Sequence, residues 1–359
     1  MTAIIFIAVI SILVFVHELG HFVMAKRAGM RVEEFGFGFP PRLWGTKRGD
    51  TVYSINVIPF GGFVKIYGED GDERTNPQSF GSKSFSARMK VILAGVTMNL
   101  LFAMFLLMIG NTMGLRKAVE DSNVGIARNK QVQIYQVAPD SPAQSADIRV
   151  LDEILGFKQS SGALTTVTDG ADVQNFVHSH KGERVTVLLK RGNENLEKEI
   201  TLRANPPAGQ GPMGIAPILT GEYSYPWYES IWRGVSDGAI LTVNTMYGYY
   251  TLFENLFTKG SLGADVSGPV GIASLTGQAA RVGFNFLLQF IAMISVNLAI
   301  LNVIPFPALD GGRAFLLIVE KIKGSPINKH IEGMLNAAGF IALLALMAFV
   351  TFKDIAKFF

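Results

Sequence analysis

Two histidines and a glutamate form a His-Glu-x-x-His arrangement close to the start of the chain, as His17, Glu18 and His21. On a helix, side chains four residues apart project from the same side, so the imidazoles of His17 and His21 can bind one metal ion. Two imidazole nitrogens suit zinc, and a carboxylate beside the first ligand can accept a proton from an attacking water. The spacing therefore predicts a zinc site with His17 and His21 as metal ligands and Glu18 as the catalytic base.

The motif stands in an apolar run, because from Thr2 to Val23 the only ionisable side chains are the three of the motif. Ionisable groups at membrane depth are costly, which favours a functional site over the alternative, a hydrogen-bonded pair of core histidines with a buried glutamate. The run has no basic segment before it and no small-x-small cleavage pattern. We therefore expect a retained transmembrane helix rather than a cleaved signal peptide.

The composition is that of a membrane protein. Of the 359 residues, 49% are hydrophobic and only 17% are charged, whereas a soluble domain has about a quarter charged residues. The chain contains no cysteine, so a metal site must use His, Asp or Glu. The net charge of +3, carried by dispersed basic residues, excludes a nucleic-acid-binding surface as the main function.

Four apolar runs are long enough to cross a bilayer, which predicts a polytopic α-helical membrane protein. They are residues 2–25, 91–115, 284–304 and 335–352. The loops after the first and third runs carry many Lys and Arg residues, so the positive-inside rule places both loops in the cytosol and the long central segment outside. His17 then lies about 22 Å along the first helix from Thr2, nearer the cytosolic face.

The first cytosolic loop, residues 32–67, contains short runs with strand character. Glu33–Pro41 alternates Phe with Gly, Val52–Val57 alternates polar and apolar residues, and the apolar stretch Ile58–Ile66 follows. These strands are unusually apolar for open water, and irregular backbone at membrane depth must be buried in protein or line a cavity. We expect a re-entrant β-sheet beside the metal helix, with an aromatic hairpin in the cytosol as the alternative.

The central part of the chain predicts a separate soluble α+β domain over residues 121–206. Its expected elements are strands at 132–137 and 150–157, a short helix near 142–148, a helix at 171–178 and a hairpin of 184–190 with 196–202 across Gly192-Asn193. Residues 207–282 are expected to be a linker that contains an amphipathic helix on the outer membrane surface, since Tyr225–Phe257 is rich in Trp and Tyr. Residues 238–253 are uncharged, so a further span there is the alternative.

A third metal ligand is needed, because a catalytic zinc ion has three protein ligands. Asp310 follows the third span at a depth that matches His17 and His21, after Pro305 and Pro307 end the helix. We therefore predict Asp310 as the third ligand. Two asparagines in the same apolar helix, Asn297 and Asn302, are candidates to hydrogen-bond the backbone of a substrate or a neighbouring helix.

Two separated motifs together resemble the site-2 proteases, which are intramembrane zinc metalloproteases. They are His17–His21 and the run from Asn302 to Gly311 with its Pro-x-Pro and Leu-Asp-Gly. Pro139–Ala143 with Leu151–Leu155 resembles part of a PDZ domain, and Gly268–Ile272 recurs before the third span in the bacterial RseP/RasP branch. The resemblance covers nearly the whole chain, and it departs from the best-known Gram-negative members in having one PDZ domain instead of two.

The resemblance implies a zinc metalloendopeptidase of the bacterial plasma (inner) membrane, with its PDZ domain outside the cytoplasm. It implies a core of two halves, residues 1–115 and 283–359, around the inserted domain. Substrates would be transmembrane segments of single-span membrane proteins, such as anti-sigma factors, and remnant signal peptides; a peptide or membrane-protein segment would bind the PDZ domain. The re-entrant sheet would receive the unwound substrate at Gly36, Gly38, Gly61, Gly62, Phe63 and Val64.

Two other functions remain alternatives. A non-catalytic PDZ membrane scaffold or receptor with a metal site would need ligands but no adjacent base, so Glu18 argues against it. A metal transporter would repeat its ligands along several helices, whereas His178, His180 and His330 lie outside the expected spans. The intact motif favours the protease.

Overall fold

A computed structural model describes residues 2–69, 75–119, 126–159, 161–192, 194–260 and 268–356. The chain forms two compact units: Met1–Met108, Ile231–Gln278 and Leu288–Phe359 make the first, and Ile109–Ser230 with Ala279–Leu287 make the second. Residue 121, where the inserted domain was expected to begin, and the expected turn residue Asn193 lie outside the described residues.

Four helices of the described chain are long and apolar enough to cross a membrane, which confirms the expected number of candidate spans. They are α1 (Thr2–Arg27), α3 (Ala94–Met113), α8 (Phe284–Val303) and α10 (Lys329–Ala356). The run predicted as one span from residue 91 is divided, because helix α2 (Phe85–Ile92) ends there and α3 begins after Leu93. Ser84 caps α2 by accepting a hydrogen bond from the amide of Ala87.

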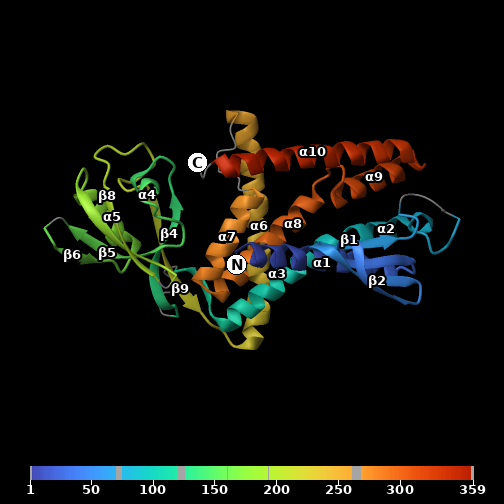
Figure 1. Ribbon diagram of the computed structural model, residues 1–359, viewed down its shortest axis with the longest axis horizontal. Coiled ribbons are helices and arrows are strands. Elements are labelled where there is room, and N and C mark those ends of the chain that lie inside the picture. Colours follow the sequence, from blue (N-terminus) through green and yellow to red (C-terminus); the bar gives the residue numbers. More distant parts are fainter. Residues whose placement is uncertain are drawn as a thin grey trace. The chain divides into compact units, whose positions relative to one another are not determined.

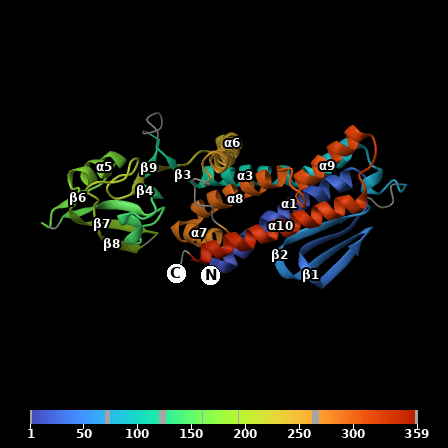
Figure 2. The same ribbon diagram turned by 90° about the horizontal axis from the view of Figure 1, so that it is seen from above.

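The first unit also contains a sheet of two long strands, β1 (Val32–Arg48) and β2 (Thr51–Ile66), where several short strands were expected. Residues 34–37 have strand partners on both sides, since Glu34 is opposite both Lys65 and Val52, and Phe37 is opposite both Gly62 and Ile55. The sheet thus curls on itself. Both ribbon views show it beside α1 (Figures 1 and 2).

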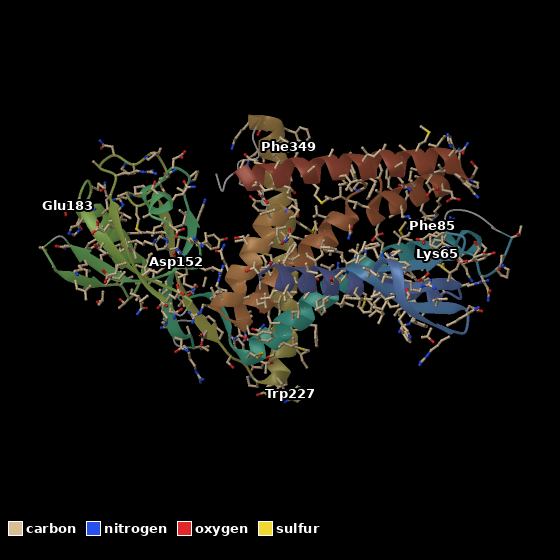
Figure 3. All side chains as sticks on the ribbon, viewed as in Figure 1. Lys65, Phe85, Asp152, Glu183, Trp227 and Phe349 are labelled. Carbon is tan, nitrogen blue, oxygen red and sulfur yellow. The ribbon has the colours of Figure 1, made fainter. Side chains whose placement is uncertain are left out.

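Three further helices complete the first unit's core and its connections: α6 (Trp227–Lys259), α7 (Pro269–Val282) and α9 (Asp310–Lys323). A 3-10 turn, η1 (Phe80–Ser82), precedes α2. Helix α6 is 33 residues long, and Trp227, labelled in Figure 3, stands at its start. It is not among the four helices that meet the length and hydropathy requirements for a span, and its place in the membrane stays a prediction.

The second unit is built on a sheet of seven strands among the described residues. These are β3 (Leu115–Ala118), β4 (Arg128–Val137), β5 (Glu153–Gln159), β6 (Leu164–Thr166), β7 (Arg184–Arg191), β8 (Glu194–Thr201) and β9 (Ile215–Tyr223), in the order β3-β9-β4-β5-β7-β8 with β6 beside β5. Strand β9 was not predicted, and it lies beyond residue 206, where the inserted domain was expected to end. Because β9 pairs with both β3 and β4, it connects β3 to the rest of the sheet.

Two helices cover this sheet, α4 (Pro142–Ser145) and α5 (Gly170–Ser179). The rings of Phe157 on β5 and Phe176 on α5 stack with centroids 4.2 Å apart in a core of buried Val, Ile and Leu side chains. Asp152, labelled in Figure 3, is buried and pairs with Arg191 on β7 at 2.7 Å. These contacts make the second unit a small α+β fold, as the alternation of its residues predicted.

Candidate metal centre

Helix α1 brings the two histidines of the motif together. His17 and His21 lie one turn apart, each is only 8% exposed, and their Nε2 atoms are 3.1 Å apart. The apolar sequence of α1 keeps the helix continuous through this turn, and no proline or helix-breaking pair interrupts it. The imidazoles therefore point to one place at the buried face of α1.

Asp310 reaches the same place from the far end of the chain. Helix α8 ends at Val303, Pro305 and Pro307 prevent its continuation, and α9 begins at Asp310. Oδ2 of Asp310 lies 3.0 Å from Nε2 of His17 and 3.4 Å from Nε2 of His21. The structure thus places Asp310 beside the two histidines, as its predicted depth required.

The three side chains have the geometry of a zinc site. Ligand atoms about 2.1 Å from a tetrahedral zinc ion are about 3.4 Å from one another, and the three separations here are 3.0, 3.1 and 3.4 Å. They form a group of potential ligands within 4.8 Å of one another. Oδ2 of Asp310 is buried without a hydrogen-bond partner, as expected for an atom that binds a cation. The donor set therefore fits zinc.

The ring nitrogens that face away from this point contact the segment formed by α2 and α3. Nδ1 of His21 lies 2.8 Å from the carbonyl oxygen of Val91, and Nδ1 of His17 lies 3.4 Å from Nδ2 of Asn99. Gly95 lies beneath both rings, and a Cβ atom there would be 2.6 Å from Nε2 of His17. Asn99 and Gly95 were missed in the sequence; the signal for Asn99 was a polar residue inside an apolar span.

Glu18, the remaining residue of the motif, contacts the sheet. Its Oε2 accepts a hydrogen bond from the amide of Val64 on β2, at 3.2 Å. Gly61 has a φ of +75°, and a Cβ atom there would lie 2.7 Å from Cβ of Val14, so only glycine lets β2 approach α1 so closely. Of the predicted substrate-binding residues, Val64 and Gly61 thus lie against α1.

The other predicted substrate residues in the sheet lie close to these. Gly62 approaches the ring of Phe15 on α1, and Phe63 pairs with Gly36 on β1. The ring of Phe63 also stacks on Phe39, with centroids 6.3 Å apart. Gly38 is further along β1, against the carbonyl of Ile58 on β2. These residues thus lie on the paired strands β1 and β2.

The two asparagines of α8 differ in their surroundings. Oδ1 of Asn297 accepts a hydrogen bond from the hydroxyl of Tyr249 on α6 at 3.0 Å, and its Nδ2 donates to the carbonyl of Met293. The amide of Asn297 therefore contacts the neighbouring helix α6 and the backbone of its own helix α8. Asn302 lies in the last turn of α8, three residues before Pro305.

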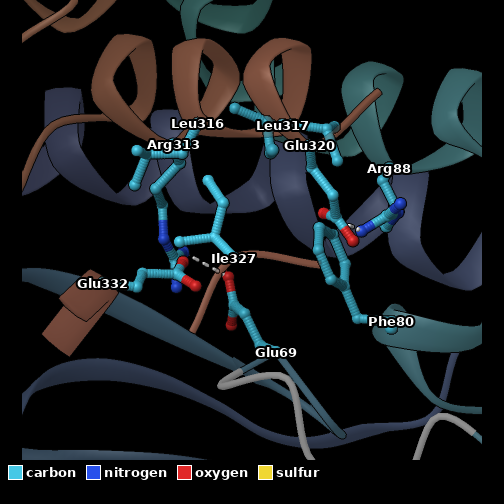
Figure 4. Close-up of a pocket in the computed structure, with 11 residues that line it drawn as sticks. Glu69, Phe80, Arg88, Arg313, Leu316, Leu317, Glu320, Ile327 and Glu332 are labelled. Carbon is cyan, nitrogen blue, oxygen red and sulfur yellow. Dashed lines mark hydrogen bonds and ion pairs between the residues drawn. The ribbon is translucent and has the colours of Figure 1, made fainter. Parts of the chain in front are cut away.

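Two ion pairs hold α9, the helix that begins with Asp310. Arg313 pairs with Glu69, just after the end of β2, and Arg88 on α2 pairs with Glu320 at 3.0 Å. Figure 4 shows both pairs lining one small cavity, with Phe80 and Leu317 between them. One ion pair therefore connects α9 to the segment after β2, and the other connects α9 to α2.

The second unit has a groove of its own, between α5 and the start of β9. It has a volume of about 420 Å³ and is lined by Val173, Val177, Met213 and Ile215, with His178 and Gln210 among the polar groups. The edge of a strand beside an amphipathic helix can accept an extended peptide. This groove is the candidate peptide site of the second unit.

Comparisons with known proteins give a consistent result. The model of the family described as peptidase family M50 matches residues 5–346. A protein of Clostridium perfringens that bears the name of a zinc metalloprotease is 38% identical over 96% of each chain. The regulator of sigma-W protease RasP of Bacillus subtilis is 29% identical over the whole of this chain and 99% of its own.

Proposed function

Because this chain belongs to peptidase family M50, the site-2 proteases, we propose that His17, His21 and Asp310 hold its zinc ion and that Glu18 is the general base. The chain is an intramembrane zinc metalloprotease. The observation that carries the residue assignment is the convergence of three ligand atoms from the two ends of the chain. The pairing of Glu18 with the sheet supports its separate role.

The reaction is hydrolysis of a peptide bond. When bound, zinc supplies a Lewis acid that lowers the pKa of water towards neutrality and polarises the scissile carbonyl. Glu18 accepts a proton from the attacking water and passes it to the leaving amine nitrogen. His17, His21 and Asp310 orient the ion, and their burial on the inner face of α1 restricts the access of bulk water.

The sheet presents the substrate. A transmembrane helix hides its carbonyls in hydrogen bonds, so the scissile segment must unwind and can then pair as an added strand. Residues 61–66 form an open edge, because among the described residues no strand other than β1 pairs with them. The amide of Val64 donates a hydrogen bond to Glu18 on α1, so this amide is directed towards α1. An added strand would thus lie beside Glu18.

The sheet's exposed apolar residues support a re-entrant position in the membrane. Phe39, Leu43, Trp44, Ile55, Val57 and Phe60 are all exposed. A cytosolic sheet would place this apolar surface in water, at a cost that burial in lipid removes. The active site would then lie nearer the cytosolic face and the second unit outside the cytoplasm.

The substrates are transmembrane segments of single-span membrane proteins in the bacterial plasma membrane, including anti-sigma-factor-like proteins and remnant signal peptides. The name of the Bacillus subtilis relative, a regulator of sigma-W, supports such a regulatory role. The second unit acts as a PDZ domain, and its groove between α5 and β9 binds a peptide or a membrane-protein segment. Substrate selection is thus divided between the groove and the open edge of the sheet.

Purified protein and a single-span reporter in a bilayer test these assignments. Protein with one zinc ion per chain should cut the reporter within its apolar segment, and His17→Ala or Asp310→Ala should lose both zinc and cleavage. Retention of stoichiometric zinc by Asp310→Ala would contradict the ligand assignment. Gln174→Trp, at an exposed residue that lines the groove of the second unit, should block the groove and slow cleavage of full-length substrates more than of a short apolar segment.

A further inference from the structure

We propose that Asn99 is a positioning residue for the zinc site: its amide oxygen accepts the Nδ1 proton of His17, which leaves Nε2 free to bind the metal. The inference rests on the assignment of His17 as a zinc ligand. In this role Asn99 binds neither the metal ion nor the substrate. It acts through the tautomer of His17.

The tautomer of each histidine decides whether it can bind zinc. A neutral imidazole carries one proton, and a nitrogen that binds a metal must be the one without it. Both Nε2 atoms face Asp310, so both Nδ1 atoms must carry the proton. A buried N–H requires an acceptor, and metal-binding histidines characteristically donate this proton to a carbonyl or carboxylate.

His21 meets the requirement directly. Its Nδ1 lies 2.8 Å from the carbonyl oxygen of Val91, which can only accept. Val91 is in the last turn of α2, where its carbonyl oxygen accepts from the amide of the C-cap residue Leu93 and can accept a second hydrogen bond, since a carbonyl oxygen has two lone pairs. The break between α2 and α3 thus supplies the acceptor for one of the two ligands.

His17 depends on a side chain that can present either a donor or an acceptor. Nδ2 of Asn99 lies 3.4 Å from Nδ1 of His17, while Oδ1 of the same amide is buried without a hydrogen-bond partner and the residue is 1% exposed. In this orientation two donors would face each other once Nδ1 is protonated. Half a turn of the amide exchanges its oxygen and nitrogen. It then pairs Oδ1 with the Nδ1 proton and gives the orphaned oxygen a partner.

The backbone around Asn99 packs closely against neighbouring groups. Ser295 on α8 is buried, and its hydroxyl donates to the carbonyl oxygen of Asn99 at 2.7 Å. Gly95, one turn earlier on α3, allows the helix to lie against both imidazoles. Both contacts involve the backbone of α3, and neither touches the side-chain amide of Asn99.

Zinc affinity, measured by competition with a chelator in the Glu18→Gln background, tests the proposal without reference to turnover. Asn99→Leu preserves the size of the side chain and removes the acceptor, so zinc should bind about 10- to 100-fold more weakly. Asn99→Asp keeps an acceptor oxygen and should retain zinc nearly as tightly as the parent. Ser295→Ala is the matched control, because it removes a buried hydrogen bond to Asn99 and leaves the amide in place.

Two results would overturn the proposal. One is an Asn99→Leu protein that binds zinc as tightly as the parent; the other is an equal loss in Ser295→Ala, which would assign the effect to packing between α3 and α8. If instead the parent binds no zinc, or His17→Ala retains it, the zinc-site assignment itself fails. The two failures are therefore distinguishable.

Nitrogen-15 NMR of protein labelled only at histidine provides a measurement that does not need the Asn99→Leu protein to fold. The chain has five histidines, so the His17 signals can be assigned by their loss in a His17 variant. The zinc-loaded parent should show a protonated Nδ1 and a metal-bound Nε2 at His17. A metal-bound Nδ1 at His17 would overturn the proposal.

Discussion

The amide nitrogen of Val64 donates a hydrogen bond to Oε2 of Glu18 across 3.2 Å, and so joins the open edge of the sheet to the catalytic helix. The two residues come from different elements, β2 and α1. The hydrogen bond holds a carboxylate at the position where an added strand would lie. In the proposed mechanism, recognition of an unwound segment and proton transfer would therefore occur at one point.

Glu18→Gln tests the role of this carboxylate. The amide keeps the size of the side chain and can still accept the hydrogen bond from Val64, but it cannot take a proton at neutral pH. Cleavage of a single-span reporter should fall by about 100- to 10,000-fold, the usual contribution of a general base. Zinc content should stay at one ion per chain, since Glu18 is not among the three converging ligands. Normal cleavage by this variant would contradict the mechanism.

Removal of zinc should destabilise the protein measurably. A ligand present at 100 times its dissociation constant stabilises the folded state by about 2.7 kcal/mol, so the zinc-loaded protein should have the higher Tm in detergent. Asp310→Asn should remove most of this zinc-dependent shift, because the neutral amide is a weaker ligand than the carboxylate. Scans with and without a chelator measure both effects. An unchanged zinc-dependent shift in Asp310→Asn would count against Asp310 as a ligand.

Gly95→Ala should disrupt the site without replacing any of the proposed ligands. The added methyl group would lie 2.6 Å from Nε2 of His17, so the imidazole or α3 must move. We expect a loss of zinc affinity on the order of tenfold or more, by analogy with other changes that reorient metal ligands. Gly333→Ala on α10 is the control, because a Cβ atom there meets open space. Equal zinc affinity in both variants would mean that the site tolerates the displacement.

The ion pair of Arg313 with Glu69 should matter more for catalysis than the pair of Arg88 with Glu320. Arg313 is one turn from Asp310 on α9, and Glu69 lies just after the end of β2, so their pair links Asp310, the proposed third ligand, to the sheet (Figure 4). Arg313→Met should lower kcat on the order of tenfold to a hundredfold, the effect of a small misplacement.

Arg88→Met is the matched control for this prediction, since it breaks a pair at the opposite end of α9. It should lower Tm and leave kcat close to that of the parent. Combining Arg313→Glu with Glu69→Arg should restore part of the lost rate if the charge pair is the cause. A rate loss in Arg88→Met equal to that in Arg313→Met would indicate a general loosening of the fold.

The local stability of the second unit around Asp172 should depend on pH. Hydrogen bonds from the Thr168 backbone amide and hydroxyl and from the Asp169 amide hold the pKa of the Asp172 carboxyl below its ordinary value. A lowered folded-state pKa stabilises the fold above the unfolded value of about 4. The contribution is lost as the pH falls through the folded value.

Amide hydrogen exchange in α5 of the full chain measures this contribution. Asp172→Asn should accelerate exchange in the first turn of α5 a few-fold at neutral pH, because Asp169 and Asp172 form the helix's capping box. The difference from the parent should shrink as the pH falls below about 4 and should vanish once the pH passes below the lowered pKa of the folded Asp172 carboxyl. Glu183→Gln, a charge change elsewhere in the second unit, is the control. A difference that persists unchanged at low pH would contradict the charge-dependent explanation.

The chemistry of the site could be predicted from the order of residues. The relative positions of His17, Glu18 and His21 are set by a single helical turn, because a helix has the same periodicity wherever it packs. The four apolar runs are recognisable because the bilayer imposes their length and composition. Asp310 could be named because few acidic residues lie at the depth of the two histidines, and prolines mark the break before it.

Only the tertiary structure decided which groups surround these residues. Asn99 and Gly95 lie against the histidines because α3 crosses α1 closely, and no local pattern specifies that crossing. Strand β9 joins the second unit's sheet across a long sequence separation. Its sequence contains Pro, Gly and other small or polar residues, which are also typical of a linker. Local periodicity determines what a segment becomes, whereas contacts between segments far apart in sequence depend on packing that the whole chain must satisfy together.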